Sequence, residues 1–420
     1  MGVYKFALRM MNIFASECIF YFISIIISIA LIFNCLNVVT MSNFIGMNET
    51  QNRILTGIPF FLALIICLFT FYANSYFVIN KTKEMAIEAL CGVSERKLSN
   101  YLLLQNLIIE LSGFVIGLVI GIMIQPITLT LVYKSLNSNG NIWSLNMTSI
   151  GGTVAILIIQ LLYVTAGDYA FISTKEIKDL MVLEKEIYAP DNRTIRFPGF
   201  MYVIIYFMPV VILFKVSGKT TDLLSVYVIC SLISINGILQ FYIPKKIANI
   251  KEKRFSDNKI MMISLSNLQY SFKKLNFLML MISSIIAFVL GLLGSFADNQ
   301  YIKIMSVIAY FSIVILISIS LIYKLRIEVQ KRKDSFRNLL LIGYTKAEVK
   351  KIILVEVLIF YVIAITIPLG HILFYIYTFL LGGIISISVA IALPATYALM
   401  FTATGLIAYQ SYKNMIIKDK

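Results

Sequence analysis

The sequence predicts an all-α integral membrane protein with ten transmembrane helices and both termini in the cytoplasm. Of its 420 residues, 59% are hydrophobic and only 14% are charged, and the mean hydropathy is +0.88. Soluble domains are about half apolar and about a quarter charged, so a water-soluble enzyme is excluded. The apolar runs are continuous, whereas barrel strands alternate over about 10 residues, and this favours helices.

Ten apolar runs approach the roughly 20 residues that one membrane-spanning helix needs. The predicted spans lie at 18–39, 54–79, 102–124, 149–167, 199–216, 223–243, 275–296, 304–323, 352–374 and 385–409.

Lys and Arg gather on one side of these spans. With a cytoplasmic N-terminus, 31 of the 36 basic residues fall in cytoplasmic segments. This is the positive-inside bias of membrane proteins, so the net charge of +15 reports topology and gives no sign of nucleic-acid binding. Lys, Ile and Asn abound, as in AT-rich bacterial genomes, so we expect a multi-pass protein of the bacterial plasma membrane. The remaining five basic residues are external: Arg53, Lys134, Lys215, Lys219 and Lys303.

Several kinds of site are excluded by composition. The chain has one His, and its five Cys include no C-x-x-C pair, which argues against a metal site and a disulfide framework. It contains neither a Walker A sequence nor G-x-G-x-x-G. We therefore expect no catalytic residues, no metal and no cofactor bound by this chain.

Two cytoplasmic segments repeat one pattern at an offset of 251 residues. Each has a basic stretch, an apolar-periodic helix, Leu-x-Gly-x-Ser/Thr and a second helix that enters the next span. Gly92 and Gly343 suit the left-handed position that ends a helix, and Ser94 and Thr345 suit the start of the next one. Thr345 with Glu348 predicts a capping box.

The repeat extends over four spans in each half of the chain. Amphipathic segments at 3–16 and 261–275 precede spans 1 and 7 and are expected to lie in the membrane interface. The predicted organisation is a first four-span repeat at 1–180, a linker with spans 5 and 6 at 181–257, and a second four-span repeat at 258–420. Both copies have the same orientation, as in parallel repeats.

The charged helix after the second span, the turns at Ala89–Ser94 and Leu340–Thr345, and a glycine-bearing third span resemble the FtsX-like permeases of ABC transporters. The ten-span layout looks most like the BceB-type permeases, which are associated with removal of antimicrobial peptides. Those permeases carry a large extracellular domain between spans 7 and 8, whereas only 297–303 joins these spans here. Members of the wider family act on different substrates, so fold alone does not select one.

The resemblance implies that two helices, about 81–91 and 331–342, dock on an ATPase subunit. A charge run alone is most often a solvated or headgroup-facing surface, but the repetition favours docking. The predicted coupling residues are Lys83, Glu84, Glu88, Gly92, Ser94, Arg332, Asp334, Arg337, Gly343 and Thr345.

The spans contain further candidates. Gly113, Gly117 and Gly121 form a stripe that lets another helix approach closely, and Pro368 in span 9 predicts a kink. Glu110 and Glu356 are either functional intramembrane acids or, the alternative we favour, groups near the cytoplasmic edge that pair with Lys or Arg.

The predicted function is that of the permease subunit of an ABC transporter, which exports or extracts from the membrane an amphipathic substrate such as an antimicrobial peptide or bacteriocin. The expected partners are the lipid bilayer and an ATPase subunit, as a dimer, that holds ATP and Mg; a membrane histidine kinase or a second permease are further candidates. Two other classes remain open: an ion-coupled secondary transporter, and a signalling or scaffold membrane protein that does not transport.

Overall fold

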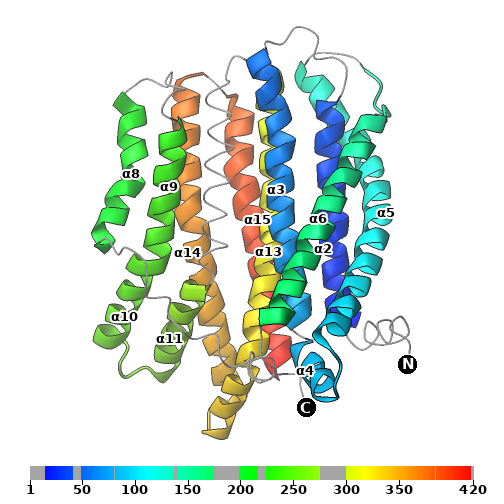
Figure 1. Ribbon diagram of the computed structural model, residues 1–420. Coiled ribbons are helices and arrows are strands. Elements are labelled where there is room, and N and C mark those ends of the chain that lie inside the picture. The colour runs from blue at the N-terminus through cyan, green and yellow to red at the C-terminus, as the bar shows by residue number, and fades with distance from the viewer. Residues whose placement is uncertain are drawn as a thin grey trace. The chain divides into compact units, whose positions relative to one another are not determined.

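The computed structural model describes residues 15–40, 49–79, 81–136, 140–174, 198–215, 224–274, 299–383 and 385–417, and every regular element in these ranges is a helix. The chain divides into two compact units, Met1–Asp191 and Asn192–Lys420. The first contains α2 (Ala15–Val39), α3 (Glu49–Ile79), α4 (Thr82–Leu90), α5 (Glu95–Leu136) and α6 (Met147–Thr174) (Figure 1). The second contains α8 (Gly199–Lys215), α9 (Leu224–Gly237), a π-helical turn η2 (Ile238–Tyr242), α10 (Ile243–Arg254), α11 (Lys259–Lys274), α13 (Gln300–Leu341), α14 (Lys346–Leu381) and α15 (Ile387–Ile417).

Seven described helices are long and apolar enough to cross a membrane. They correspond to predicted spans 1–4 and 8–10. The apolar part of α8, Gly199–Pro209, is shorter, predicted span 6 falls on α9 and η2, and predicted span 7 lies outside the described residues. The all-helical membrane fold is therefore confirmed for the described residues, while ten spans and the orientation of the termini stay predictions.

The two units share a packing pattern. In the first, α6 packs against both α3 and α5; in the second, α15 packs against both α13 and α14. These are the equivalent helices of the predicted repeat. The helices of the predicted linker, α8 to α10, belong to the second unit.

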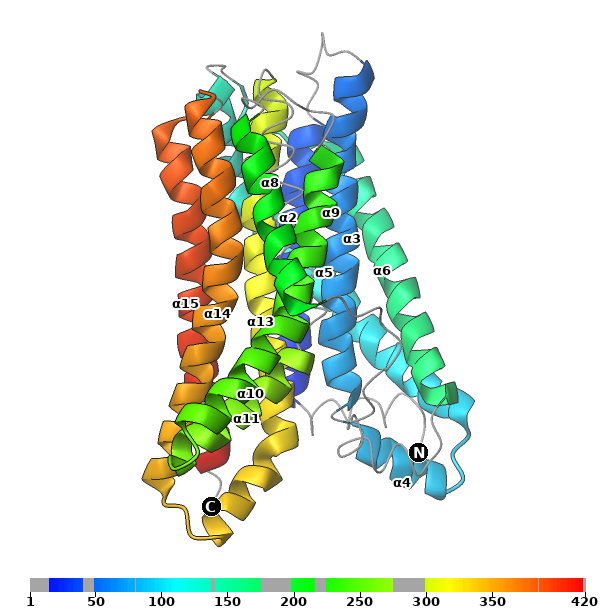
Figure 2. The same ribbon diagram turned by 90° about the vertical axis from the view of Figure 1, so that its left-hand side faces the viewer.

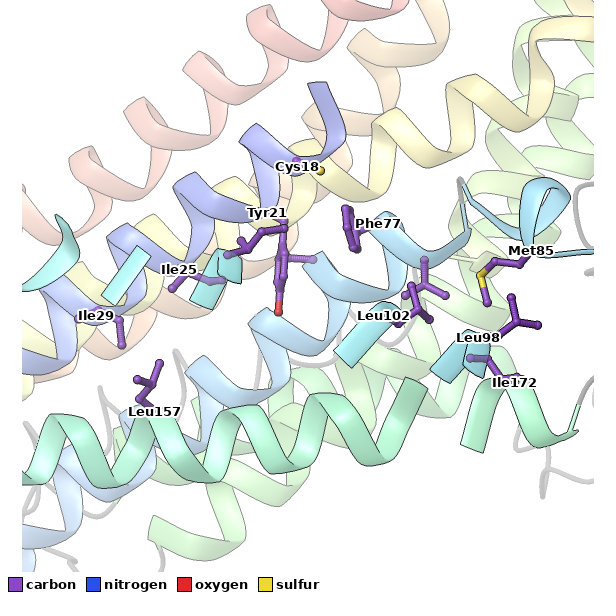
Figure 3. Close-up of a cluster of buried hydrophobic side chains, with 13 residues drawn as sticks. Cys18, Tyr21, Ile25, Ile29, Phe77, Met85, Leu98, Leu102, Leu157 and Ile172 are labelled. Atoms are coloured by element: carbon purple, nitrogen blue, oxygen red, sulfur yellow. The ribbon is translucent and has the colours of Figure 1, made fainter. Parts of the chain in front are cut away.

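The core of the first unit is built from apolar residues of α2, α3, α4, α5 and α6 (Figure 3). Tyr21 and Phe77 stack at its centre, with ring centroids 5.7 Å apart. Met85 of α4 and Leu98 of α5 are buried in the same cluster, so the short helix α4 is packed onto the bundle rather than attached by its ends alone.

The glycine stripe of α5 packs on α2, the helix partner that the sequence left open. A Cβ atom on Gly117 would lie 2.9 Å from the backbone oxygen of Ile26 and 2.9 Å from Cβ of Ile29. Gly113 and Gly121 make similar approaches to α2. Absence of a side chain therefore determines how closely these two helices approach.

Pro368 lies inside α14, which continues as a helix on both sides of it. Proline has no N–H, so the carbonyl four residues earlier loses its helical donor. That carbonyl belongs to Ala364, and the hydroxyl of Tyr397 on α15 donates to it at 3.0 Å. The second repeat thus replaces the missing helical bond with a bond to a neighbouring helix.

One expectation about local structure is wrong. The charged segment 331–342 was expected to form a separate helix, but it is the last part of α13, which is unbroken from Gln300 to Leu341. Residues 324–330 contain no Gly, Pro or other stop signal. The amphipathic helix α11 buries Leu265, Leu268 and Phe272 and packs on α14, so these apolar residues contact protein, and its place in the membrane interface stays a prediction. The matching segment 3–16 lies mostly outside the described residues.

Replacing Gly117 with Ala should lower the free energy of unfolding by about 1–3 kcal/mol, because the new methyl group meets the backbone of α2. Gly151→Ala on α6 is the matched control, since nothing lies within 4 Å of a Cβ there. That control should be neutral or stabilising by up to about 1 kcal/mol. Detergent-mediated unfolding of the purified chain measures both, and equal effects would contradict close α2–α5 packing.

Candidate functional site

In both repeats, the charged helix ends in the same glycine turn. Gly92 has φ +85° and Gly343 has φ +108°, a left-handed conformation that glycine adopts without steric cost. After α4, the N–H of Gly92 donates to the carbonyl of Ala89 and that of Val93 to Glu88. After α13, Gly343 donates to Leu340 and Tyr344 to Leu339 in the same way. These are Schellman motifs, as the sequence predicted.

The helix that follows each turn starts differently in the two copies. Thr345 and Glu348 form the predicted capping box: the Thr345 hydroxyl accepts from the N–H of Glu348, whose carboxylate accepts from the N–H of Thr345. Glu348 also pairs with Lys259 of α11 at 2.7 Å, which raises the pKa of that ammonium group. In the first copy Ser94 precedes α5, and its carbonyl accepts from Lys97 and Leu98.

Four of the ten predicted coupling residues lie at these two turns: Gly92, Ser94, Gly343 and Thr345. Gly92, Ser94, Arg337, Gly343 and Thr345 are exposed, and Glu88 is half-buried. The side chains of Lys83, Glu84 and Asp334 lie outside the described residues. Arg332 differs from the rest because it is buried, and its guanidinium therefore takes no part in an exposed surface.

The candidate docking site also includes apolar residues at the two turns, which were not predicted. Leu90 is 62% exposed, and at the equivalent end of α13 Leu341 is 78% and Ile342 is 75% exposed. We call Leu90, Cys91, Leu341 and Ile342 the tip residues; each pair precedes the turn glycine directly. Their positions at an offset of 251 residues were a signal in the sequence, because apolar residues in water beyond the predicted spans suit an interface.

In each repeat, a buried cation before the glycine turn contacts a polar side chain on the helix after the turn. Lys81 Nζ donates to Gln105 Oε1 of α5 at 2.6 Å and lies 3.6 Å from the ring centroid of Phe77. In the second copy Arg332 pairs with Glu356 of α14. Both cations and both partners are related by the offset of 251 residues. We call Lys81–Gln105 and Arg332–Glu356 the anchor pairs.

Glu110 and Glu356 have different partners. Glu356 contacts Arg332 and accepts from Asn267 of α11 at 3.2 Å, and Tyr412 of α15 also donates to it. Glu110 accepts from the hydroxyl of Tyr21 on α2 at 2.8 Å, and within the described residues no Lys or Arg pairs with it. Pairing with a cation therefore holds for Glu356 and is not seen for Glu110.

Asp168 of α6, directly after predicted span 4, is buried inside the first unit. Its two carboxylate oxygens each accept an amide N–H at 2.6 Å, from Asn74 of α3 and from Asn106 of α5. Three helices therefore meet at one carboxylate. Among the described residues, no group of three or more His, Cys, Asp or Glu is placed to hold a metal ion.

Arg332→Met should lower the free energy of unfolding by about 3–5 kcal/mol, because it leaves Glu356 buried without its cation. The double variant Arg332→Met/Glu356→Leu should recover most of this loss, since it removes both charges. Arg337→Met, at an exposed position of the same helix, is the control and should be close to neutral. A double variant as unstable as Arg332→Met, in the same unfolding assay, would exclude the buried charge as the cause.

The family model described as the FtsX-like permease C-terminal domain matches the chain twice, over residues 56–172 and 306–415. The matched residues are more than half of the chain. None of the curated proteins compared with the chain matches it significantly. Both matches run from within the second span of a repeat, across its glycine turn, to the end of its fourth span. Two matches to one model, in two units with the same helix packing, show that this multi-pass membrane protein belongs to the FtsX-like permease family.

Proposed function

We propose that this chain is the transmembrane subunit of an ABC transporter, and that a separate ATPase subunit docks on the two glycine turns. The family supports a permease role in ABC transport in general. The observation that carries the docking proposal is the pair of exposed tips, each with apolar residues directly before a glycine turn of the same geometry.

The exposed apolar side chains at the tips are unfavourable in water. Apolar side chains at the end of a helix gain free energy when a partner covers them, roughly 25 cal/mol per Å² of apolar surface. Leu90 lies on α4, and Leu341 ends α13 eighteen residues beyond the candidate span that ends at Tyr323. They are therefore placed beyond the apolar helices, where a protein groove suits them better than lipid. Two tips suit an ATPase dimer, because each of its subunits then has one docking site.

In the proposed mechanism, ATP and Mg are held by the partner, and closure of the ATPase dimer moves the tips. Each anchor pair fixes its tip to the following helix, so displacement of a tip is passed to α5 or to α14. The substrate proposed is amphipathic, such as an antimicrobial peptide or bacteriocin, and it is exported or extracted from the membrane. The BceB-type layout, the ten spans and the bacterial plasma membrane belong to the same proposal.

One observation favours a second candidate, an ion-coupled secondary transporter. Glu110 and Asp168 are buried carboxyl groups within candidate spans, and ionisable residues inside the membrane often serve ion pathways. That candidate requires substrate movement without ATP. The ABC proposal requires that movement stop when the partner ATPase cannot hydrolyse ATP.

The docking proposal is tested by purifying the tagged chain from its own membrane and measuring the ABC ATPase subunit that accompanies it. Leu90→Asp with Leu341→Asp should reduce the recovered ATPase at least about tenfold, since a charge at each apolar tip costs more than about 1.4 kcal/mol of binding. Each single variant should give a partial loss if both tips dock.

Lys253→Glu provides the control, because it changes a charge at an exposed position of α10 that belongs to neither glycine turn. The variants should keep the wild-type helix content and unfolding midpoint. Full ATPase recovery by the double tip variant would disprove docking at the turns. A loss of equal size in Lys253→Glu would show that net charge, not the tips, controls the association.

A further inference from the structure

The connection between α5 and α6 presents apolar side chains to the outside of the first unit. Trp143 is 61% and Met147 81% exposed, and Ile142 and Leu145 are exposed as well. We call these four residues the apolar ridge. It lies at the end of the first unit opposite α4 (Figure 1). The basic-residue bias predicts that this end is external.

Hydrogen bonds to the backbone hold the ridge in one conformation. The carbonyl of Ser144 accepts from the side-chain amide of Gln125 at 2.7 Å and from that of Asn37 at 3.2 Å. Asn146 donates to the carbonyl of Thr40 at 2.7 Å. The N–H of Trp143 itself donates to the side chain of Asn141 at 3.0 Å.

These bonds connect three helices under the ridge. Asn37 is fully buried on α2, and its Oδ1 accepts from Ser149 of α6 at 3.2 Å, while Gln125 belongs to α5. The connection is therefore a braced structure that holds its apolar side chains outward. Such bracing reduces the entropy that the connection would lose on binding.

The two helices that the ridge joins also expose apolar side chains. Ile127 and Leu131 of α5 and Val154 and Ile158 of α6 are exposed. Both helices are candidate membrane spans, so exposed apolar side chains on them suit acyl chains. The ridge therefore connects two helices that are expected to face lipid.

The absence of charge and the presence of tryptophan indicate which region of the membrane suits the apolar ridge. Residues 135–149 contain no charged side chain, so the ridge offers nothing for an anionic headgroup to pair with. Tryptophan concentrates at the boundary between headgroups and acyl chains, because its ring is apolar and its N–H is polar. We propose that the apolar ridge inserts into this boundary in the outer leaflet and holds the outer ends of α2, α5 and α6 at a fixed depth.

The chain contains a single tryptophan, so its fluorescence reports the ridge directly. The experiment reconstitutes the full chain in vesicles of neutral phosphatidylcholine and adds lipids brominated at different acyl depths. Bromines near the headgroups should quench Trp143 more than bromines at the bilayer centre. Emission should be blue-shifted, and acrylamide in the water should quench less than it does in the unfolded chain. Trp143→Phe measures the background from the 24 tyrosines.

The bracing is tested with Asn37→Ala, which removes contacts to Ser144 and Ser149. It should shift the emission to the red and increase quenching by acrylamide. Thr130→Ala on α5 is the matched control, because its exposed hydroxyl bonds to the carbonyl of Pro126 in its own helix. The control should keep the wild-type spectrum.

The wild-type measurement decides the proposal even if a variant does not fold. Quenching by acrylamide equal to that of the unfolded chain, without quenching by bromolipid, would show that the ridge faces water or a protein partner and would overturn the proposal. So would quenching that requires anionic lipid, or quenching confined to bromolipid in the inner leaflet. The proposal does not depend on ATPase docking, so either can fail alone.

Discussion

The contact on which both repeats depend is a buried cation held by the helix that follows the glycine turn. Lys81 and Arg332 are equivalent positions, and their partners Gln105 and Glu356 are equivalent too. A buried cation is strongly destabilising unless a polar partner is fixed beside it. The chain before each glycine turn therefore cannot separate from the chain after it. The tip residues, the glycine turn and the first turns of α5 or α14 are therefore expected to move together. A partner bound at a tip would then displace the helix that follows the turn.

The separation in sequence between interacting residues determined which features of the two repeats could be predicted. The turns at Gly92 and Gly343 and the capping box at Thr345 were predictable, because residues within a few positions determine them. The glycine stripe was predictable as a flat face, but its spacing carries no information about which helix packs there. The anchor pairs were missed because Lys81 and Arg332 were each taken as part of a charge run. Applying the repeat offset to every polar residue, rather than to the turns alone, would have found them.

Other features were beyond the sequence for a physical reason. One of them is the burial of Asp168, which stands near the end of an apolar run and has no neighbour in sequence that predicts it. Its burial depends on Asn74 and Asn106, which are 94 and 62 residues away in the chain. The continuity of α13 was hidden for the opposite reason. A high density of Lys, Arg and Glu suggested a change of element, although these residues are good helix formers and do not end a helix.

The repeats share one contact but would transmit a displacement differently under the proposed function. In the first copy α3 ends at Ile79 and α4 begins at Thr82, as Figure 2 shows, so α4 can change direction through the few dihedral angles between them. A displacement at Gly92 then reaches α5 through the chain at Val93 and Ser94 and through the hydrogen bond from Lys81 to the neutral Gln105. In the second copy α13 is unbroken to Leu341, and bending it would break helical hydrogen bonds. Its anchor is also an ion pair, in which both donor and acceptor are charged, whereas Lys81 donates to a neutral acceptor. The two repeats therefore differ in two local features, a helix break before the first tip and an amide in place of a carboxylate in the first anchor pair. Under the proposed function, these differences would make the two repeats pass a displacement of the tip differently.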